Sequence, residues 1–216
     1  MARRSAPSLR RRGPSRPPKT QIWVFCEGEK TEPDYLIWFA RQHRHESIEI
    51  RPVKGCGVPR TVVEKARDRK RELERLARPH RASSFDGRFE VWVMIDRDEH
   101  PQVVEAWVMA RDNGIGWAFS NPCVELWGVL HVADQTAAIH RHDCQALLHA
   151  LTPSYHHERG ACFDPSAMVS GYDDAVRRAR HLEARREAAE DLGGNPSTTV
   201  YRLTESIRGG GTLKNQ

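Results

Sequence analysis

The stretch FEVWVMIDRDEHP, residues 89–101, decides how the chain folds. Its first seven residues are mostly apolar and rich in β-branched and aromatic side chains, which is typical of a buried strand. The acidic segment that follows ends the strand, and Pro101 suits the first turn of a helix running to about residue 112. Asn113-Gly114 then stops that helix. A buried strand that leads directly into a helix is the repeating unit of an α/β sheet.

The same alternation continues on both sides of this stretch. Its order predicts a mostly parallel, four-stranded sheet flanked by helices. Beyond residue 133 the periodicity indicates a wholly helical C-terminal third, with Ser197 in the region that caps its last helix. The expected strands are 21–26, 47–53, 89–95 and 115–120, and the expected helices are 34–43, 60–78, 101–112, one after 120, 143–151, 172–192 and 198–207.

This pattern divides the chain into four parts. Residues 1–20 are predicted to be a disordered basic arm, and residues 21–133 an α/β core. Residues 134–208 are predicted to form a helical extension, followed by a flexible tail at 209–216.

The positive charge of the chain belongs to the arm. The net charge is +5, but residues 1–20 hold seven Lys or Arg and no acid, so the remainder has 27 basic against 29 acidic residues. A basic arm attracts nucleic acid by neutralising phosphates and releasing counterions. A solubilising tail is the alternative explanation.

The composition argues against a membrane protein or a disulfide-rich one. No run of eighteen apolar residues exists. The five cysteines form no CxxC pair, so we expect free thiols in a cytoplasmic protein and no structural zinc site. The histidine-rich stretch HRHDC (140–144) fits either a metal site or a polar helix face.

Acidic residues follow the strands at the edge of the sheet where function concentrates in α/β folds. Glu27 follows the first strand, Asp96 and Asp98 follow the third, and Glu125 begins the helix after the fourth. Side chains two residues apart at a strand end point the same way, so the carboxylates of Asp96 and Asp98 converge. Hard oxygen ligands suit Mg²⁺ or Mn²⁺, which can polarise a phosphoryl oxygen and activate a water. A DxD motif by itself is most often only solvated; its position after an apolar strand favours a site.

Four segments in this order resemble RloB-like proteins, a group with a Toprim-like fold. The resemblance covers about residues 20–208. The segments are IWVFCEGEKTEPDYL (22–36), VWVMIDRDEH (91–100), FSNPCVELWGVLHV (119–132) and NPSTTVYRL (195–203).

The resemblance implies roles for the acidic residues. Glu27 would be a metal ligand or the general acid/base, and Asp96 and Asp98 would ligate metal. Glu125 would complete a second metal site. Glu32 is a weaker candidate ligand, because its five-residue offset from Glu27 need not point it inward.

The remaining candidates concern the substrate. Lys30 is the basic residue predicted to stabilise the charge that develops on the phosphate. Gly28 permits a tight turn that brings the backbone near a phosphate. Ser120 and Asn121 are predicted either to orient the substrate or to form an ordinary turn into the next helix.

The resemblance therefore implies a Mg²⁺- or Mn²⁺-dependent nuclease acting on DNA or RNA, the effector of a prokaryotic antiphage defence system with an ABC-type ATPase as partner. The chain has no GxxxxGK[ST] loop of its own. One alternative is a non-catalytic subunit that docks on the ATPase through its helical third. Two others are nucleotide hydrolysis and strand transfer by a primase or topoisomerase, which would need a partner domain. The sequence does not indicate the oligomeric state.

Overall fold

The computed structural model describes residues 19–43, 48–77, 88–97, 100, 102–155, 163–209 and 211. The predicted arm and tail therefore lie almost wholly outside the described residues, as does Asp98. The strands are β1 (Thr20–Cys26), β2 (Ile48–Val53), β3 (Phe89–Asp96), β4 (Gly116–Asn121) and β5 (Ser197–Thr198). The helices are α1 (Thr31–Gln42), α2 (Pro59–Ala77), α3 (Val103–Asp112), α4 (Glu125–Val132), α5 (Arg141–Leu151), α6 (Pro165–Ser170), α7 (Tyr172–Ala188) and α8 (Val200–Arg208).

The predicted mostly parallel sheet is confirmed. In the described residues it has the order β2-β1-β3-β4-β5, in which the first four strands run parallel and β5 is antiparallel to β4. The prediction of four strands was one short, because β5 consists of two residues and carries no periodicity. Ser197 belongs to this strand rather than to a helix cap, a position that Thr199 holds before α8.

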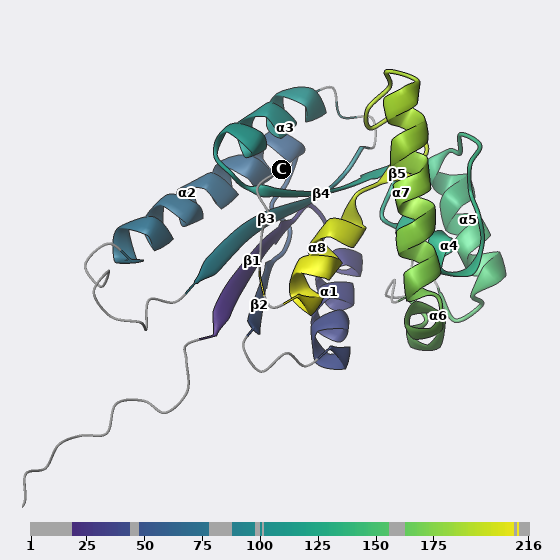
Figure 1. Ribbon diagram of the computed structural model, residues 1–216, viewed down its shortest axis with the longest axis horizontal. Coiled ribbons are helices and arrows are strands. Elements are labelled where there is room, and N and C mark those ends of the chain that lie inside the picture. Colours follow the sequence, from purple (N-terminus) through teal and green to yellow (C-terminus); the bar gives the residue numbers. More distant parts are fainter. Residues whose placement is uncertain are drawn as a thin grey trace, which may run out of the picture.

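Helices cover both faces of the sheet (Figure 1). Helices α2 and α3 lie on one face, and α1 and α8 lie on the other. The side chains of β1 alternate between these layers: Ile22 and Val24 join the core under α1, whereas Phe25 joins the core under α2 and α3. This alternation follows from the two-residue period of a strand, and it explains why the central strands are apolar on both faces.

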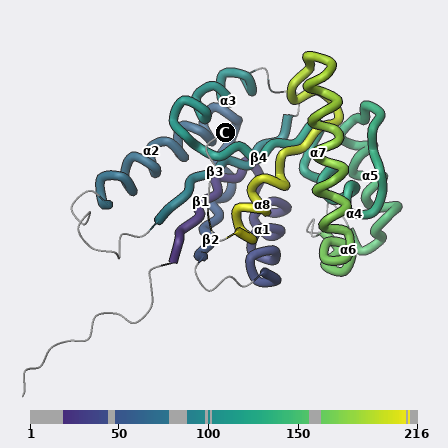
Figure 2. The backbone as a smooth tube through the Cα atoms, viewed as in Figure 1, coloured from purple at the N-terminus to yellow at the C-terminus, as the bar shows by residue number. Residues whose placement is uncertain are grey.

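The C-terminal helices pack beside the sheet and share its core. The tube in Figure 2 shows α4, α5, α6 and α7 gathered beyond β4, and α8 returning across the sheet. One hydrophobic cluster runs from Ile22 in β1 through Trp127 in α4 and Leu148 in α5 to Ile207 in α8. The division predicted at residue 133 stays a prediction, but the residues on its two sides are packed into one core.

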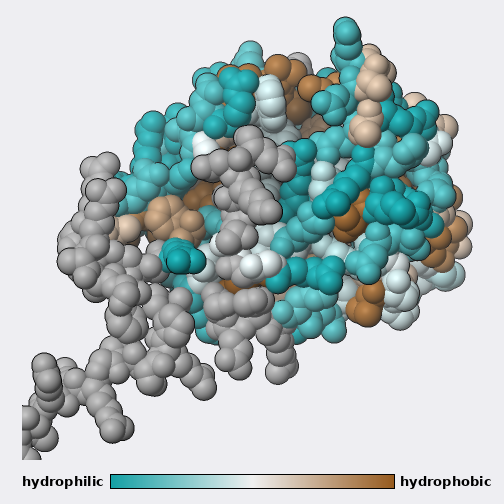
Figure 3. Space-filling model, in the orientation of Figure 1, coloured by the Kyte–Doolittle hydropathy of each residue, from teal (hydrophilic) through white to brown (hydrophobic). Residues whose placement is uncertain are grey.

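On the face of the molecule shown in Figure 3, the hydrophobic residues of the described part of the chain form small separate groups and no large apolar patch. The most exposed large apolar side chains, Leu192, Val104 and Leu76, come from different parts of the fold. None of the helices in the described part of the chain combines the length and apolar character that a membrane span needs.

Candidate functional site

A cavity of about 320 Å³ lies where the β1–α1 loop, the end of β3 and the start of α4 meet. The strand order explains this meeting, because β1 and β4 flank β3 and all three parallel strands end at the same edge. Backbone hydrogen bonds continue past the strands: the Glu27 amide donates to Met94 at 3.1 Å and the Arg97 amide to Ser120 at 2.7 Å. The cavity is lined by Glu27, Gly28, Glu29, Lys30, Thr31, Glu32, Asp96, Val124, Glu125 and Arg141.

Four of the predicted acidic residues thus reach one cavity. Glu27 is paired with His100, whose Nε2 lies 2.9 Å from the Glu27 Oε1 atom. Both side chains are partly exposed, at 19% for Glu27 and 30% for His100, so water can reach the pair. His100 lies in the predicted DRDEHP segment, but no pattern in the sequence distinguishes it from the other histidines.

Glu32 is more deeply placed than its offset from Glu27 suggested. Helix α1 begins at Thr31, three residues before the predicted start, so Glu32 lies in its first turn. Only 5% of Glu32 is exposed, and its Oε1 accepts a hydrogen bond of 3.1 Å from the Gly28 amide. Burial raises the pKa of Glu32, and the charges of Glu125 and Glu27 raise it further, against hydrogen bonds from the Glu32 and Gly28 amides.

Gly28 is required by this contact. A Cβ atom at this position would lie 2.8 Å from Glu32 Oε1 and still closer to Oε2. The backbone amide of Gly28 donates its hydrogen bond to Glu32. A phosphate that approached this loop, as predicted, would compete with the Glu32 carboxylate for that amide.

Replacing Gly28 with alanine is expected to lower the free energy of unfolding by about 1–3 kcal/mol, because the buried carboxylate of Glu32 is pushed away from its amide donor. Urea denaturation measures the loss. The matched control is the same replacement in a Glu32→Ala background, where the cost should fall to about a third or less. An equal cost in both backgrounds would show that the glycine is needed for another reason.

Asp96, the last residue of β3, lines the cavity together with the other carboxylates. Burial of its carboxyl group raises the pKa of Asp96 well above the ordinary range, and the charges of Glu32, Glu125 and Glu27 add to that effect in this order. A hydrogen bond with the Val124 backbone opposes the shift and ties Asp96 to the start of α4.

Glu125 enters the cavity from the first turn of α4, where the helix dipole favours a negative charge. It is 2% exposed, and its Oε1 accepts a 2.6 Å hydrogen bond from the hydroxyl of Tyr155. Tyr155 follows α5, about 30 residues further along the chain. No feature of the sequence indicated this long-range contact.

Two cations face the carboxylates. Lys30, the predicted one, is exposed and lies at the N-cap of α1. Arg141, the first residue of α5, reaches the cavity from the C-terminal helices and is partly buried. The HRHDC pattern suggested its neighbours His140 and His142 as candidates, and no pattern indicated Arg141. In the structure His140 caps α5 by accepting a hydrogen bond from the His142 amide.

Ser120 and Asn121 do not line the cavity. The Ser120 hydroxyl lies 3.0 Å from that of Thr198, and the Asn121 amide donates to the Gly193 carbonyl at 2.8 Å. Both side chains are buried in contacts that fasten β4 to β5 and to the turn before it. These contacts fit a structural role, and the predicted contact with substrate stays a prediction.

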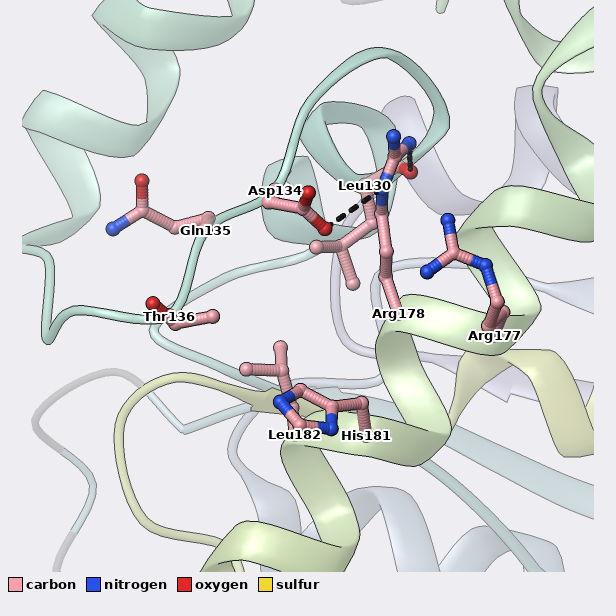
Figure 4. A pocket seen from close by; sticks show the side chains of 8 residues that line it. All are labelled: Leu130, Asp134, Gln135, Thr136, Arg177, Arg178, His181 and Leu182. Carbon is pink, nitrogen blue, oxygen red and sulfur yellow. Dashed lines mark hydrogen bonds and ion pairs between the residues drawn. The ribbon is translucent and has the colours of Figure 1, made fainter.

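A second, smaller pocket of about 30 Å³ lies between the end of α4 and α7 (Figure 4). Arg178 of α7 points across it to Asp134 at 2.9 Å and donates to the Leu130 carbonyl at 2.7 Å. It thereby satisfies the C-terminal end of α4. The pocket has room for about one water, and its arginine joins two helices.

The donor set of the large cavity fits a hard divalent cation, although a preformed cage is missing. Within the described ranges, no three His, Cys, Asp or Glu side chains are grouped closely enough to hold a metal ion. Mg²⁺ commonly uses only one or two carboxylates, and waters and substrate phosphates supply its other ligands. Burial and the neighbouring carboxylates raise the pKa of Asp96 and of Glu32, and a bound cation would relieve the repulsion among these groups. Zn²⁺ is a poor fit, since it prefers a tetrahedral set with nitrogen or sulfur ligands.

Comparison with known proteins bears on this arrangement. The family model described as RloB-like protein matches residues 22–207, from the first strand to the last helix. The chain belongs to the RloB-like family. No curated protein and no solved structure matches it.

The match includes every residue that lines the cavity, and also His100 and Tyr155. The acidic cavity is thus part of the RloB-like unit. The Toprim-like relationship of this sheet stays a prediction.

Proposed function

We propose that this RloB-like protein is a Mg²⁺- or Mn²⁺-dependent Toprim-type nuclease that hydrolyses phosphodiester bonds in DNA or RNA. The observation that carries the proposal is a single cavity in which Glu27, Glu32, Asp96 and Glu125 face Lys30 and Arg141. Carboxylates that repel one another are costly to fold, and cations beside them suit a phosphate. The carboxylates and the cations together favour a phosphate substrate that binds along with a metal ion.

The surroundings of the carboxylates favour different roles for them, as metal ligands or as the general base. Asp96 and Glu125 line the cavity from the end of β3 and the start of α4, and these two are the proposed ligands, with waters and substrate phosphates supplying the rest. Glu32 is a further candidate, and Asp98 is a predicted ligand outside the described residues. A bound ion would polarise the phosphoryl oxygen and lower the pKa of a water. Glu27 has a histidine partner, and this pairing favours the general-base role over direct ligation.

The protein's own groups then perform the proton and charge handling. The Glu27 carboxylate accepts the proton of the attacking water, and His100 holds that carboxylate in orientation through its Nε2. Arg141 binds the phosphate whose charge grows during attack, and Lys30 at the exposed mouth attracts the nucleic-acid backbone. The basic arm, outside the described residues, is proposed to add to this attraction.

The biological setting is proposed from the family relationship alone. The chain would be the effector of an antiphage defence system and would work with an ABC-type ATPase. The C-terminal helices would have two duties, because α5 and the segment after it also complete the cavity.

A cleavage assay tests the proposal. The purified full chain is incubated with DNA and with RNA of mixed sequence, with Mg²⁺, with Mn²⁺ and with EDTA. We expect cleavage that requires the metal and leaves ends produced by hydrolysis. If cleavage persists in EDTA, or in an Asp96→Ala variant, the proposed site is wrong.

One observation favours a second function, a non-catalytic subunit of the ATPase. Among the described residues, no three His, Cys, Asp or Glu side chains are placed closely enough to hold a metal ion. This alternative predicts no cleavage and no Mn²⁺ binding by the pure chain or by the chain mixed with its ATPase. The same assay, repeated with the partner present, separates the two functions.

A further inference from the structure

Glu125 accepts a hydrogen bond from the hydroxyl of Tyr155, a residue that does not itself line the cavity. The bond from the Tyr155 hydroxyl to Glu125 Oε1 measures 2.6 Å, and both residues are almost fully buried, at 0% and 2% exposed. A short hydrogen bond from a hydroxyl to a carboxylate, shielded from water, is among the stronger ones in proteins.

Tyr155 is itself rigidly placed. Its amide donates to the Thr152 carbonyl at 2.9 Å, and its own carbonyl lies 2.6 Å from Nδ1 of His149. Its ring packs against Phe163, with the ring centroids 6.1 Å apart. These contacts hold the backbone and the ring of Tyr155 in the position from which its hydroxyl meets Glu125.

The geometry assigns Tyr155 as a positioning residue that fixes the Glu125 carboxylate in place to ligate the divalent ion. This inference rests on the proposed metal-dependent function and deepens it, since it makes the C-terminal helices part of the metal site. Outer partners of this kind orient the ligand itself, and their loss commonly weakens metal binding by about 10–100-fold.

Tyr155 does not serve as an attacking nucleophile. It is 0% exposed and is not among the residues that line the cavity. Its hydroxyl donates to Glu125 Oε1 at 2.6 Å and is occupied by that contact. A strand-transfer reaction through this tyrosine is therefore not what the site is built for.

The test is Mn²⁺ binding by calorimetry to the full chain and to two tyrosine variants. Tyr155→Phe keeps the ring and removes the hydroxyl. Tyr172→Phe is the matched control, because Tyr172 is also buried, at 6% exposed, and its hydroxyl lies 2.9 Å from that of Thr204, away from the cavity. We expect Tyr155→Phe to raise the Kd for Mn²⁺ about 10-fold, and Tyr172→Phe to change it less than about twofold.

Two further readouts separate positioning from general damage. Cleavage by Tyr155→Phe should recover at saturating Mn²⁺, whereas a loss caused by partial unfolding would not. Tyr155→Phe added to Glu125→Gln should weaken Mn²⁺ binding no further than Glu125→Gln alone, since the hydroxyl acts only through that carboxylate.

Each outcome decides the matter. A wild-type chain that binds no Mn²⁺ overturns both this inference and the proposed function. A wild-type chain that binds Mn²⁺, with Tyr155→Phe equal to it or with both tyrosine variants equally weakened, overturns the inference and leaves the proposed function standing.

Discussion

Replacing Asp96 with asparagine is expected to lower metal-dependent cleavage by about 10³-fold or more while making the metal-free protein more stable. The loss of activity follows from the loss of a ligand, since several kcal/mol of transition-state stabilisation correspond to several powers of ten in rate. The gain in stability follows from the charges around Asp96, where Glu32, Glu125 and Glu27 all oppose its ionisation.

The pH dependence of stability tests the same repulsion. The folded protein raises the pKa of Asp96 and of Glu32, so it binds their protons more tightly than the unfolded chain does. The associated stability is present below the ordinary carboxyl range and is lost as the pH rises through the raised values. Metal-free wild type should therefore lose melting temperature as the pH rises above the ordinary carboxyl range, and Asp96→Asn should lose less.

Thermal unfolding in EDTA and in Mg²⁺ measures both effects. At about pH 8 in EDTA, Asp96→Asn is expected to melt about 2–4 °C above wild type, the shift that ~1 kcal/mol produces in a chain of this size. Mg²⁺ should raise the melting temperature of wild type more than that of the variant. Asp34→Asn is the matched control, because Asp34 is exposed on α1 and outside the cavity. A variant that is less stable than wild type at every pH would contradict the repulsion.

The convergence of Glu27, Asp96 and Glu125 was accessible from the sequence for a physical reason. Each follows a strand with a clear apolar pattern, and parallel strands place their carboxyl ends at one edge. Glu32 was undervalued because helix α1 starts at Thr31 instead of residue 34, which turns the Glu32 side chain back toward Gly28. The Thr-Glu-Pro sequence, with proline in the first turn, was the available signal for this earlier start.

The contribution of the C-terminal helices could not be predicted in the same way. Through the packing of α5 against α4, Arg141 reaches the cavity and Tyr155 reaches Glu125. No periodicity in the sequence indicates which helix packs against which. The two-residue strand β5 and the six-residue helix α6 are likewise too short for a pattern. Prediction from sequence found the groups fixed by strand order and missed those fixed by tertiary packing.

The second large effect is expected at Arg141, the cation proposed to bind the phosphate. Replacing Arg141 with alanine is expected to lower kcat/KM by about 10²–10³-fold, because a preorganised charge at the reacting phosphate is lost from a partly buried site. Lys30→Ala, the replacement at the position that the sequence favoured, should cost less than about 10-fold. Lys30 is exposed, so water and salt already screen its charge.

Metal affinity and salt dependence distinguish the role of Arg141 from that of the carboxylates. Removing a positive charge beside the metal site should leave Mn²⁺ binding unchanged or tighter, whereas Asp96→Asn should weaken it. Arg141→Lys should restore only part of the rate, because a lysine lacks the planar fork that binds two phosphate oxygens at once. The Lys30→Ala defect should appear mainly in KM and should disappear as salt is raised, while the Arg141→Ala defect should persist. If Lys30→Ala abolishes cleavage and Arg141→Ala cleaves normally, the phosphate is bound from the β1–α1 loop, and the C-terminal helices contribute only structure to the cavity.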